Sequence, residues 1–444
     1  MNPCEHTDQI FRLLPVSAGR DGDRLTIAGH DVVALAQQFG TPLYVYDEAT
    51  LEANVDSYER ALRASYAGPW EISYASKAFL CLALAQWCHR RGLGLDVVSG
   101  GELALALQAG FPPDKIHLHG NNKTDDELNL ALDAGVGRIV LDHPQEIPRL
   151  ERLAAERGMV ADVWMRVTPG IDVHTHAYTA TGHVETKFGF HLAEGIAERA
   201  AREVLASPHL RLRGLHVHLG SQLFDAEPIA LALRELWRLA DRLRGQGGIL
   251  EEVSSGGGWG VPYHLEAPAA SVERYVQRLA AELIQLAEQR GDPPPRWVLE
   301  PGRSLVARAG IAVYRVGAVK RIPGRTYVLI DGGLADNPRP ALYQARYTAL
   351  IANRLGQLPT ETVAVAGPYC ESGDVLIHEV ALPDVQPGDI LVVPMSGAYH
   401  LSMASNYNGA LRPAVVWASR RGVQLIRRRE VVEDLWRRDV ALRA

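Results

Sequence analysis

The strongest constraint on the fold is a regular alternation of two kinds of segment between about Asp47 and Ser304. Segments with the periodicity of amphipathic helices alternate with short apolar segments of strand length. Eight of the short segments are expected to form strands: Ile72–Lys77, Gly94–Ser99, Ile116–Asn121, Arg138–Asp142, Val163–Pro169, Leu212–Ser221, Ile249–Gly257 and Trp297–Ser304. Each follows a helical segment. Eight such repeats with mostly short connections predict a (β/α)8 barrel.

Local signals mark where several predicted helices begin and end. Thr124 followed by Glu127 is a capping box at the start of the helix expected over residues 124–134, and another helix is expected over Ser271–Gln289. Glycines commonly end the helices, at Gly92, Gly110, Gly135, Gly158 and Gly291. These signals support the helical half of the alternation.

Beyond Ser304 the pattern changes to strands separated by Gly and Pro, which predicts a β-rich second domain. The strands expected there are Ile311–Val319, Thr326–Ile330, Glu361–Ala366, Ile390–Pro394 and Ala414–Ser419. Two further strand-like segments, Arg24–Ile27 and Leu43–Tyr46, precede the barrel, and we expect them to pair with the C-terminal sheet. The predicted domains are therefore a barrel over residues 47–304 and a β-rich domain built from residues 1–46 and 305–444.

Composition excludes several classes of protein. The 444 residues have a formal net charge of -6, so there is no basic excess to bind nucleic acid. No run of eighteen apolar residues occurs, and Met1–His6 lacks the pattern of a signal peptide, so we expect no membrane partner and a soluble cytoplasmic protein. The four cysteines, Cys4, Cys81, Cys88 and Cys370, lack the spacing of zinc ligands, and no metal is expected.

Unusual side chains gather where the active site of a barrel is expected, at the carboxyl ends of the strands. They are Lys77, Asp96, His119, Arg166, His216, His218, Gly256–Gly258, Glu300 and Arg303. Each alone has an ordinary explanation, since a lysine that ends a strand is usually solvated and three glycines often form only a tight turn. Their coincidence at one face of the barrel favours a functional site.

Together these residues suit a phosphorylated aromatic aldehyde. Lys77 supplies an amine for an imine, the glycines let backbone N–H groups approach a phosphate, and Arg303 adds positive charge. Glu300 can hold a proton on a pyridine nitrogen, which makes the ring a strong electron sink. His218 has the flat side chain needed to lie on a ring face.

Ten ordered motifs along nearly the whole chain carry a family resemblance. They are Tyr74–Lys77, Leu95–Glu102, His119–Lys123, His174–His176, Lys187–Phe190, His216–Gln222, Glu300–Arg303, Asp336–Pro340, Cys370–Asp374 and Ser402–Tyr407. On these motifs the sequence resembles the fold-type III pyridoxal phosphate (PLP) decarboxylases and, within them, the diaminopimelate decarboxylase family. The resemblance implies PLP as cofactor and the PLP-dependent decarboxylation of meso-2,6-diaminopimelate to lysine and carbon dioxide.

The resemblance also implies roles for single residues. Lys77 would bind the cofactor as an imine, with Asp96 orienting it. The other cofactor residues would be His218 on the ring, Glu300 at the pyridine nitrogen, and Ser221, Gly257, Gly258, Gly302 and Arg303 around the phosphate. The distal end of the amino-acid substrate would be held by Arg303, Arg339, Tyr343 and Glu371, and Tyr399 would touch both substrate and cofactor. Cys370 would give a proton to the carbanion left after decarboxylation.

The family further implies a homodimer with shared active sites, in which Cys370, Glu371 and Tyr399 reach the site of the neighbouring subunit. Two departures from the family pattern stand out. Ser254 and Ser255 precede the glycine run where an apolar or Asn-type residue is expected, and His400 follows Tyr399 where a smaller residue is common. The histidine is expected to alter the surroundings of the substrate.

Other functions stay open from the sequence. A related decarboxylase would act on ornithine, arginine, carboxynorspermidine or carrier-bound glutamate, and Arg339 with Tyr343 discriminates best because a diamine precursor has no distal carboxylate. Alanine racemase has a similar barrel but places an arginine at the pyridine nitrogen, so Glu300 argues against it. A PLP-binding homeostasis protein would resemble the barrel alone and would leave the second-domain motifs unused.

Overall fold

The computed structural model describes residues 9–171, 186–246, 250–268 and 270–442. The chain divides into two compact units. The first, here called the barrel unit, comprises Val55–Val261 and Ala269–Gly302; the second, the β unit, comprises Met1–Asn54, Pro262–Pro268 and Arg303–Ala444.

Eight parallel strands form the closed ring of the barrel unit. They are β5 (Trp70–Ala75), β6 (Gly94–Val97), β7 (Ile116–Leu118), β8 (Arg138–Leu141), β9 (Ala161–Thr168), β11 (Leu210–His216), β12 (Glu252–Ser254) and β13 (Arg296–Leu299). Each strand pairs with the next in chain order, and the pairing of β13 with β5 completes the ring. A short strand, β10 (Phe190–His191), pairs with β9 outside the ring. The predicted (β/α)8 barrel is confirmed, with all eight strands in the expected order.

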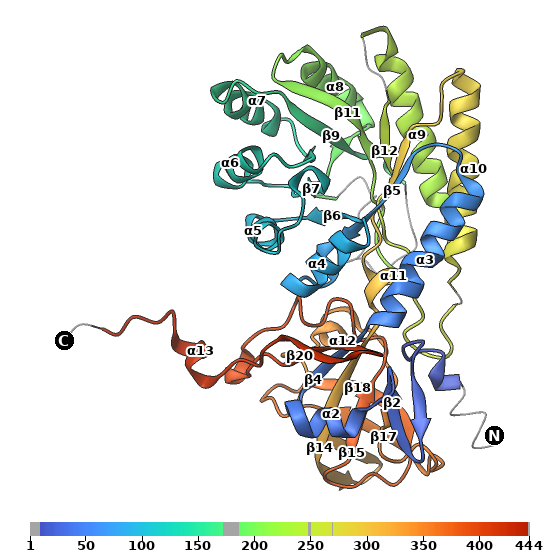
Figure 1. The fold of residues 1–444 in the computed structure, drawn as a ribbon, viewed down its shortest axis with the longest axis vertical. Coiled ribbons are helices and arrows are strands. Elements are labelled where there is room, and N and C mark those ends of the chain that lie inside the picture. Colours follow the sequence, from blue (N-terminus) through green and yellow to red (C-terminus); the bar gives the residue numbers. More distant parts are fainter. Residues whose placement is uncertain (1–8, 172–185, 247–249, 269, 443–444) are drawn as a thin grey trace. The chain divides into compact units, whose positions relative to one another are not determined.

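Helices surround this ring and lie beside one another in chain order (Figure 1). Their bounds are α3 (Glu48–Ser65), α4 (Leu82–Arg90), α5 (Gly100–Gln108), α6 (Asp125–Ala134), α7 (Glu146–Glu156), α8 (Ile196–Ala206), α9 (Glu227–Leu243) and α10 (Val272–Arg290). The capping box at Thr124 and Glu127 is present, and Gly135 ends α6 in the left-handed conformation. Ser271 caps α10 by accepting a hydrogen bond from the backbone N–H of Arg274.

The predicted strands of the barrel extended too far at their carboxyl ends. β5, for example, ends at Ala75, and Ser76–Ala78 form a short 3-10 helix, η1. β11 ends at His216 and not at Ser221. The backbone leaves the ladder just before the polar residues because these residues form the loops at the mouth of the barrel.

The largest sheet of the β unit has the order β18-β17-β15-β14-β4-β20-β21. The bounds are β4 (Leu43–Asp47), β14 (Gly310–Ile322), β15 (Arg325–Ile330), β17 (Glu361–Ala366), β18 (Val375–Leu382), β20 (Ala414–Ser419) and β21 (Gly422–Arg427), and β16 (Leu350–Ile351) pairs with β19 (Ile390–Val393), which joins β14. β4 lies between β14 and β20, so the N-terminal segment does enter the C-terminal sheet. The β-rich fold expected for these parts of the chain is confirmed.

The pairing expected for Arg24–Ile27 is wrong. This segment is β2, and it pairs with β1 (Gly19–Asp21) and β3 (His30–Asp31) in a separate three-stranded sheet. β2 pairs with its neighbour in sequence because Gly22, at φ 58°, makes a tight turn between β1 and β2. The short helix α2 (Val32–Phe39) follows and buries Val32, Val33, Leu35 and Ala36 in the core of the β unit.

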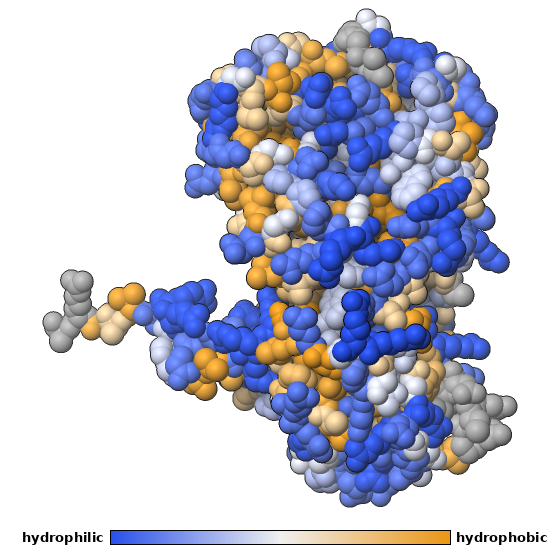
Figure 2. Space-filling model, in the orientation of Figure 1, coloured by the Kyte–Doolittle hydropathy of each residue, from blue (hydrophilic) through white to orange (hydrophobic). Residues whose placement is uncertain are grey.

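Four short helices complete the described elements of the β unit: α11 (Arg303–Val306), α12 (Arg339–Tyr343), the 3-10 helix η5 (Tyr407–Gly409) and α13 (Val432–Trp436). On the face drawn in Figure 2, hydrophilic residues cover most of each unit. Among the described residues, no helix combines the length and the hydropathy that a membrane span requires.

Candidate active site

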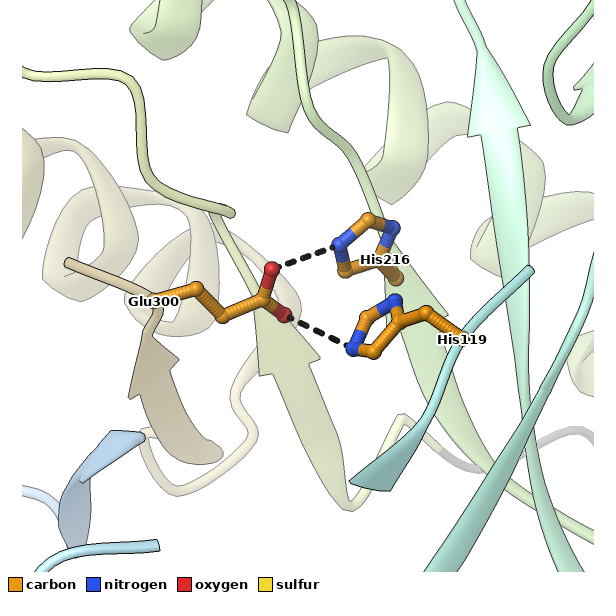
Figure 3. A group of neighbouring side chains, drawn as sticks. All are labelled: His119, His216 and Glu300. Atoms are coloured by element: carbon orange, nitrogen blue, oxygen red, sulfur yellow. Dashed lines mark hydrogen bonds and ion pairs between the residues drawn. The ribbon is translucent and has the colours of Figure 1, made fainter. Parts of the chain in front are cut away.

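A buried carboxylate stands just after β13, at the carboxyl end of the barrel. Glu300 is only 7% exposed. Its Oε2 accepts a hydrogen bond from Nε2 of His216 at 3.0 Å, and its Oε1 accepts one from the hydroxyl of Ser254 at 2.5 Å. His119 approaches the same carboxylate, with its Nε2 3.9 Å from Oε1 (Figure 3). Ser254, which departs from the family pattern, is therefore a hydrogen-bond partner of Glu300.

The charges of this group follow from burial and pairing. Burial alone would raise the pKa of Glu300, but His216 and His119 hold it below its ordinary value. Burial lowers the pKa of His216, so this histidine is neutral and donates its Nε2 proton. The result is an ionised carboxylate that is fixed by a histidine N–H and a serine hydroxyl.

A second buried carboxylate, Asp96 on β6, lies beside this group. Its Oδ1 accepts hydrogen bonds from the hydroxyl of Ser73 at 2.5 Å and from Nδ1 of His117 at 3.0 Å. Burial opposes ionisation of Asp96, but His117 and His119 hold its pKa below the ordinary value. Its other oxygen, Oδ2, has no hydrogen-bond partner among the described residues. A buried carboxylate oxygen without a partner is costly, which favours a ligand or an amine beside it.

The polar chain continues toward the amino end of the barrel. Nε2 of His117 lies 3.8 Å from Glu71, and burial of this imidazole is outweighed by Asp96 and Glu71, which raise its pKa. Further along, Glu252 on β12 accepts hydrogen bonds from Nε of Arg138 and from the indole of Trp164, both at 2.7 Å. Branched apolar residues usually fill such a barrel, so this interior is unusually polar.

Lys77 lies on η1, immediately after β5, and its side chain is exposed. A second motif lysine, Lys123, is buried and donates to the carbonyls of Gly120 and Val140 at 2.6 and 2.7 Å, and it forms an ion pair with Glu146 at 2.7 Å. These contacts hold the ammonium and tie its loop to the neighbouring strand.

His218 follows β11, and its Nδ1 accepts a hydrogen bond from the backbone N–H of Gly257 at 3.2 Å. Burial, then the positive charge of Lys77, lowers the pKa of His218 well below its ordinary value. The imidazole is therefore neutral with its proton on Nε2. The glycine run fixes the orientation of this ring.

No side chain fits at the glycine run. A Cβ on Gly257 would lie 2.0 Å from the carbonyl oxygen of Glu300, and one on Gly258 would lie 2.1 Å from that of Gly220. Gly258 also has φ 93°, a conformation that other residues rarely adopt. Gly302 is close to the side chains of Ala75 and Ala78, and Ser221 is half-buried in the loop after β11.

Two arginines of the β unit share one tyrosine ring. Arg303 donates from Nη1 to the hydroxyl of Tyr263 at 2.6 Å, and the guanidinium of Arg339 lies over the same ring, 4.5 Å from its centroid. Burial alone would raise the pKa of Tyr263, but the two guanidiniums lower it overall. Arg303 also lies 4.6 Å from the ring centroid of Tyr399. Two buried cations beside one another form a site for an anion.

Arg339 contacts a second tyrosine, Tyr347, in addition to Tyr263. It is 5% exposed, and it donates from Nη1 to the hydroxyl of Tyr347. Its Nε has no hydrogen-bond partner among the described residues. Tyr263 and Tyr347 were not expected from the sequence, because they stand outside the recognised motifs and have no distinctive spacing.

The remaining expected residues lie on loops or at an element end. Cys370 and Glu371 are exposed between β17 and β18, and the backbone N–H of Cys370 donates to Oδ1 of Asn408 at 2.9 Å. Tyr343 is half-buried at the end of α12. Tyr399 has φ 62°. The motif His174–His176 lies outside the described residues.

His119, His216 and Glu300 also offer ligand atoms within 4.8 Å of one another, an arrangement that a metal ion could use. Nε2 of His216 is hydrogen-bonded to Glu300 at 3.0 Å, which is the arrangement of a carboxylate paired with an imidazole. Nδ1 of His216 and Nε2 of His119 have no hydrogen-bond partner among the described residues.

Comparison with known proteins shows which family of enzymes the chain resembles. Residues 49–307 match the family described as "Pyridoxal-dependent decarboxylase, pyridoxal binding domain". Diaminopimelate decarboxylase of Bacillus subtilis is 45% identical over 94% of this chain and 95% of the relative, and that of a Synechocystis species is 42% identical over 96% and 92%. A crystal structure of diaminopimelate decarboxylase from M. jannaschii in complex with L-lysine has a TM-score of 0.90 at 34% identity, covering 96% of this chain and 98% of that one.

The fold and these matches define a pyridoxal-dependent decarboxylase of the barrel type. Within that class, the chain belongs to the diaminopimelate decarboxylase family. The similarity extends through both units, because the relatives are matched over nearly their whole length.

Proposed function

We propose that the protein is a PLP-dependent decarboxylase that converts meso-2,6-diaminopimelate to L-lysine and carbon dioxide. The observation that carries the proposal is the pair of adjacent guanidiniums, Arg303 and Arg339, which share the ring of Tyr263. Relatives at 45% and 42% identity are named for this activity, and a similar crystal structure contains L-lysine. Identity and geometry therefore support the same substrate.

The residues of the barrel unit fit the cofactor. Lys77 would hold it covalently, since it is exposed just after β5, whereas Lys123 is buried against two carbonyls and Glu146. Oδ2 of Asp96, which has no hydrogen-bond partner among the described residues, would accept a hydrogen bond from that amine. When bound, PLP supplies the electron sink for the electron pair left at the α-carbon as carbon dioxide departs.

Glu300 would keep a proton on the pyridine nitrogen. The carboxylate is ionised and held by His216 and Ser254, so it can accept a strong charge-assisted hydrogen bond. A neutral His218 would lie on the ring face without adding a charge. The phosphate would be held by the backbone at Gly258 and Gly302, with Ser221, Gly257 and Arg303 beside it.

The substrate must be oriented so that the bond to the departing carboxylate stands perpendicular to the ring. A distal carboxylate gives the protein a group to hold, and the Nε–H of Arg339, which no described residue accepts, would donate to it. Ornithine and arginine have no distal carboxylate, so they would leave this buried cation without an anion. Tyr343 and Glu371 would complete the grip on the distal end, with Glu371 accepting from the distal ammonium.

Arg339→Ala tests this assignment. We expect the KM for meso-diaminopimelate to rise by one to two decades, because a charge-assisted pair is worth about 1.5 to 3 kcal/mol. Arg346→Ala is the matched control, since Arg346 is exposed and pairs with Glu266. If the KM is unchanged in Arg339→Ala, or rises equally in both variants, Arg339 does not hold the substrate.

We further propose a homodimer in which Cys370, Glu371 and Tyr399 act in the site of the neighbouring subunit. The support is the family resemblance and the exposure of Cys370 and Glu371 on the loop between β17 and β18. In this arrangement Cys370 protonates the α-carbon after decarboxylation, and its thiolate is later reprotonated from solvent.

Subunit mixing tests the shared site. Lys77→Ala and Cys370→Ala would each be inactive alone, but an equimolar refolded mixture would recover about a quarter of the wild-type activity, because half of the dimers would contain one intact site. Exchange is measured separately, by an affinity tag on one variant that retains the untagged variant after refolding. No recovery of activity, with mixed dimers demonstrated in this way, would place Cys370 in the site of its own subunit.

A further inference from the structure

A chain of buried side chains in the β unit connects Arg339 to a carboxylate. Tyr347 stands next to Arg339 and also contacts His400, with its hydroxyl 2.8 Å from Nε2 of the imidazole. The other ring nitrogen of His400, Nδ1, lies 3.2 Å from the hydroxyl of Tyr44. Tyr44 in turn donates to Oδ2 of Asp336 at 2.9 Å.

Arg339 and Asp336, which stand at the two ends of this series of side chains, fix the direction of every hydrogen bond between them. A guanidinium only donates, so the oxygen of Tyr347 accepts from Arg339 and its own proton goes to Nε2 of His400. His400 therefore carries its single proton on Nδ1 and donates it to Tyr44. The hydroxyl of Tyr44 then donates to Asp336, which only accepts when it is ionised.

This direction of the hydrogen bonds requires that the imidazole of His400 is neutral. Burial, together with Arg339 and Arg303, lowers the pKa of His400 well below its ordinary value, and the side chain is 1% exposed. A protonated ring would donate at both nitrogens and would compete with Arg339 for the oxygen of Tyr347. Burial raises the pKa of Asp336 to about 6, so this group is mainly ionised at neutral pH and balances the guanidinium charge.

These contacts leave the guanidinium of Arg339 little freedom. Tyr347 fixes its Nη1, and the face of Tyr263 fixes its plane at 4.5 Å from the ring centroid. With these two constraints in place, the Nε–H remains without a partner among the described residues. His400, the side chain that departs from the family pattern, links Tyr347 to Tyr44 and, through it, to Asp336.

We propose that His400 and Tyr347 are positioning residues that orient the guanidinium of Arg339, and thereby set the preference for a ligand with a distal carboxylate. The proposal rests on the function proposed above for Arg339. Neither residue needs to touch the substrate. Their effect is confined to ligands that use Arg339.

Two ligands distinguish a loss of affinity for the distal carboxylate from a general disruption of the binding site. L-lysine, the product that remains after one carboxylate of meso-diaminopimelate is lost, retains the distal carboxylate. Cadaverine has the same chain and both amines but no carboxylate. The affinity of the PLP-loaded protein for each ligand would be measured by calorimetry, together with the inhibition constants against meso-diaminopimelate.

Tyr347→Phe removes one hydroxyl and little volume. We expect it to weaken L-lysine binding about tenfold, the equivalent of one hydrogen bond to a charged group, and to leave cadaverine binding within about twofold. Tyr314→Phe is the matched control, because the hydroxyl of Tyr314 donates to the same oxygen of Asp336 at 2.6 Å and lies 3.4 Å from that of Tyr44, but is not one of the links between Asp336 and Arg339. It should change neither affinity.

Substitutions of His400 test the direction of the hydrogen bonds that run from Arg339 to Asp336. In His400→Gln one amide can accept from Tyr347 and donate to Tyr44, so lysine affinity should stay within about threefold of wild type, whereas His400→Leu should lose about tenfold. If His400→Leu fails to fold in a thermal melt, Tyr347→Phe alone decides. Equal losses for lysine and cadaverine, or unchanged lysine binding in Tyr347→Phe, would overturn the proposal. Absence of meso-diaminopimelate turnover by the wild type would instead refute the proposed function.

Discussion

Replacement of Glu300 by Gln separates the charge of the barrel carboxylate from its shape. The two side chains are nearly isosteric, and the amide can keep both observed hydrogen bonds. Its oxygen can accept from His216, and its nitrogen can donate to Ser254, whose hydroxyl can turn to accept. We therefore expect the variant to fold with a melting temperature close to that of the wild type.

The expected loss is in turnover. A neutral amide cannot accept the charge-assisted hydrogen bond that would hold a proton on the pyridine nitrogen, and such a bond is worth about 1.5 to 3 kcal/mol. Each 1.36 kcal/mol corresponds to a factor of ten in rate, so kcat should fall roughly ten- to 150-fold. The pKa of Glu300 lies below its ordinary value, so the wild-type carboxylate stays ionised above about pH 5 and the deficit should not vary from there to pH 9.

The assay is lysine formation from meso-diaminopimelate at saturating substrate, with the PLP content of each preparation measured by absorbance after release in alkali. Ser255→Ala is a suitable control, because Ser255 accepts from the indole of Trp297 at 2.9 Å, whereas the hydrogen-bond partners of the Glu300 carboxylate among the described residues are His216 and Ser254. Turnover within about threefold of wild type in the fully loaded Glu300→Gln protein would refute the reasoning, because another group would then supply the proton.

Two further predictions concern the barrel unit. Reduction of the loaded protein with borohydride, followed by peptide mapping, should place the pyridoxyl group on Lys77, because Lys123 is buried and paired; recovery of the group on Lys123 or Lys187 would refute the assignment. Glu252→Gln should lower the free energy of unfolding by about 1.5 to 3 kcal/mol at pH 7, because it removes the charge from the pair with the half-buried Arg138, which keeps Asp162 at 3.5 Å. Arg138 and Trp164 lower the pKa of Glu252 against burial, so its stabilisation is present above about pH 4.3 and is lost as the pH falls through the lower folded value. Denaturant titrations at pH 7 and at pH 3 should therefore show a smaller deficit at the lower pH; equal deficits would indicate lost packing alone.

Much of the barrel could be predicted because its signals are local. Strand and helix segments alternate along the chain, and the capping box at Thr124 and Glu127 depends on residues three apart. The order of the strands around a parallel barrel follows the chain, so Lys77, Asp96 and Glu300 could be assigned to one end of it from sequence alone. The same reasoning failed at β2, because a tight turn at Gly22 offers a nearer partner than the C-terminal sheet.

The sequence by itself therefore determined the barrel, the β-rich unit and the family, while the roles expected for the site residues stay predictions. Only the tertiary structure decided which polar groups meet. Ser254 and Glu300 are 46 residues apart and are hydrogen-bonded, and Tyr44 and His400 meet across 356 residues. Such contacts leave no periodic trace in the sequence, because a hydrogen bond depends on positions within a few tenths of an ångström that are set by the packing of whole elements.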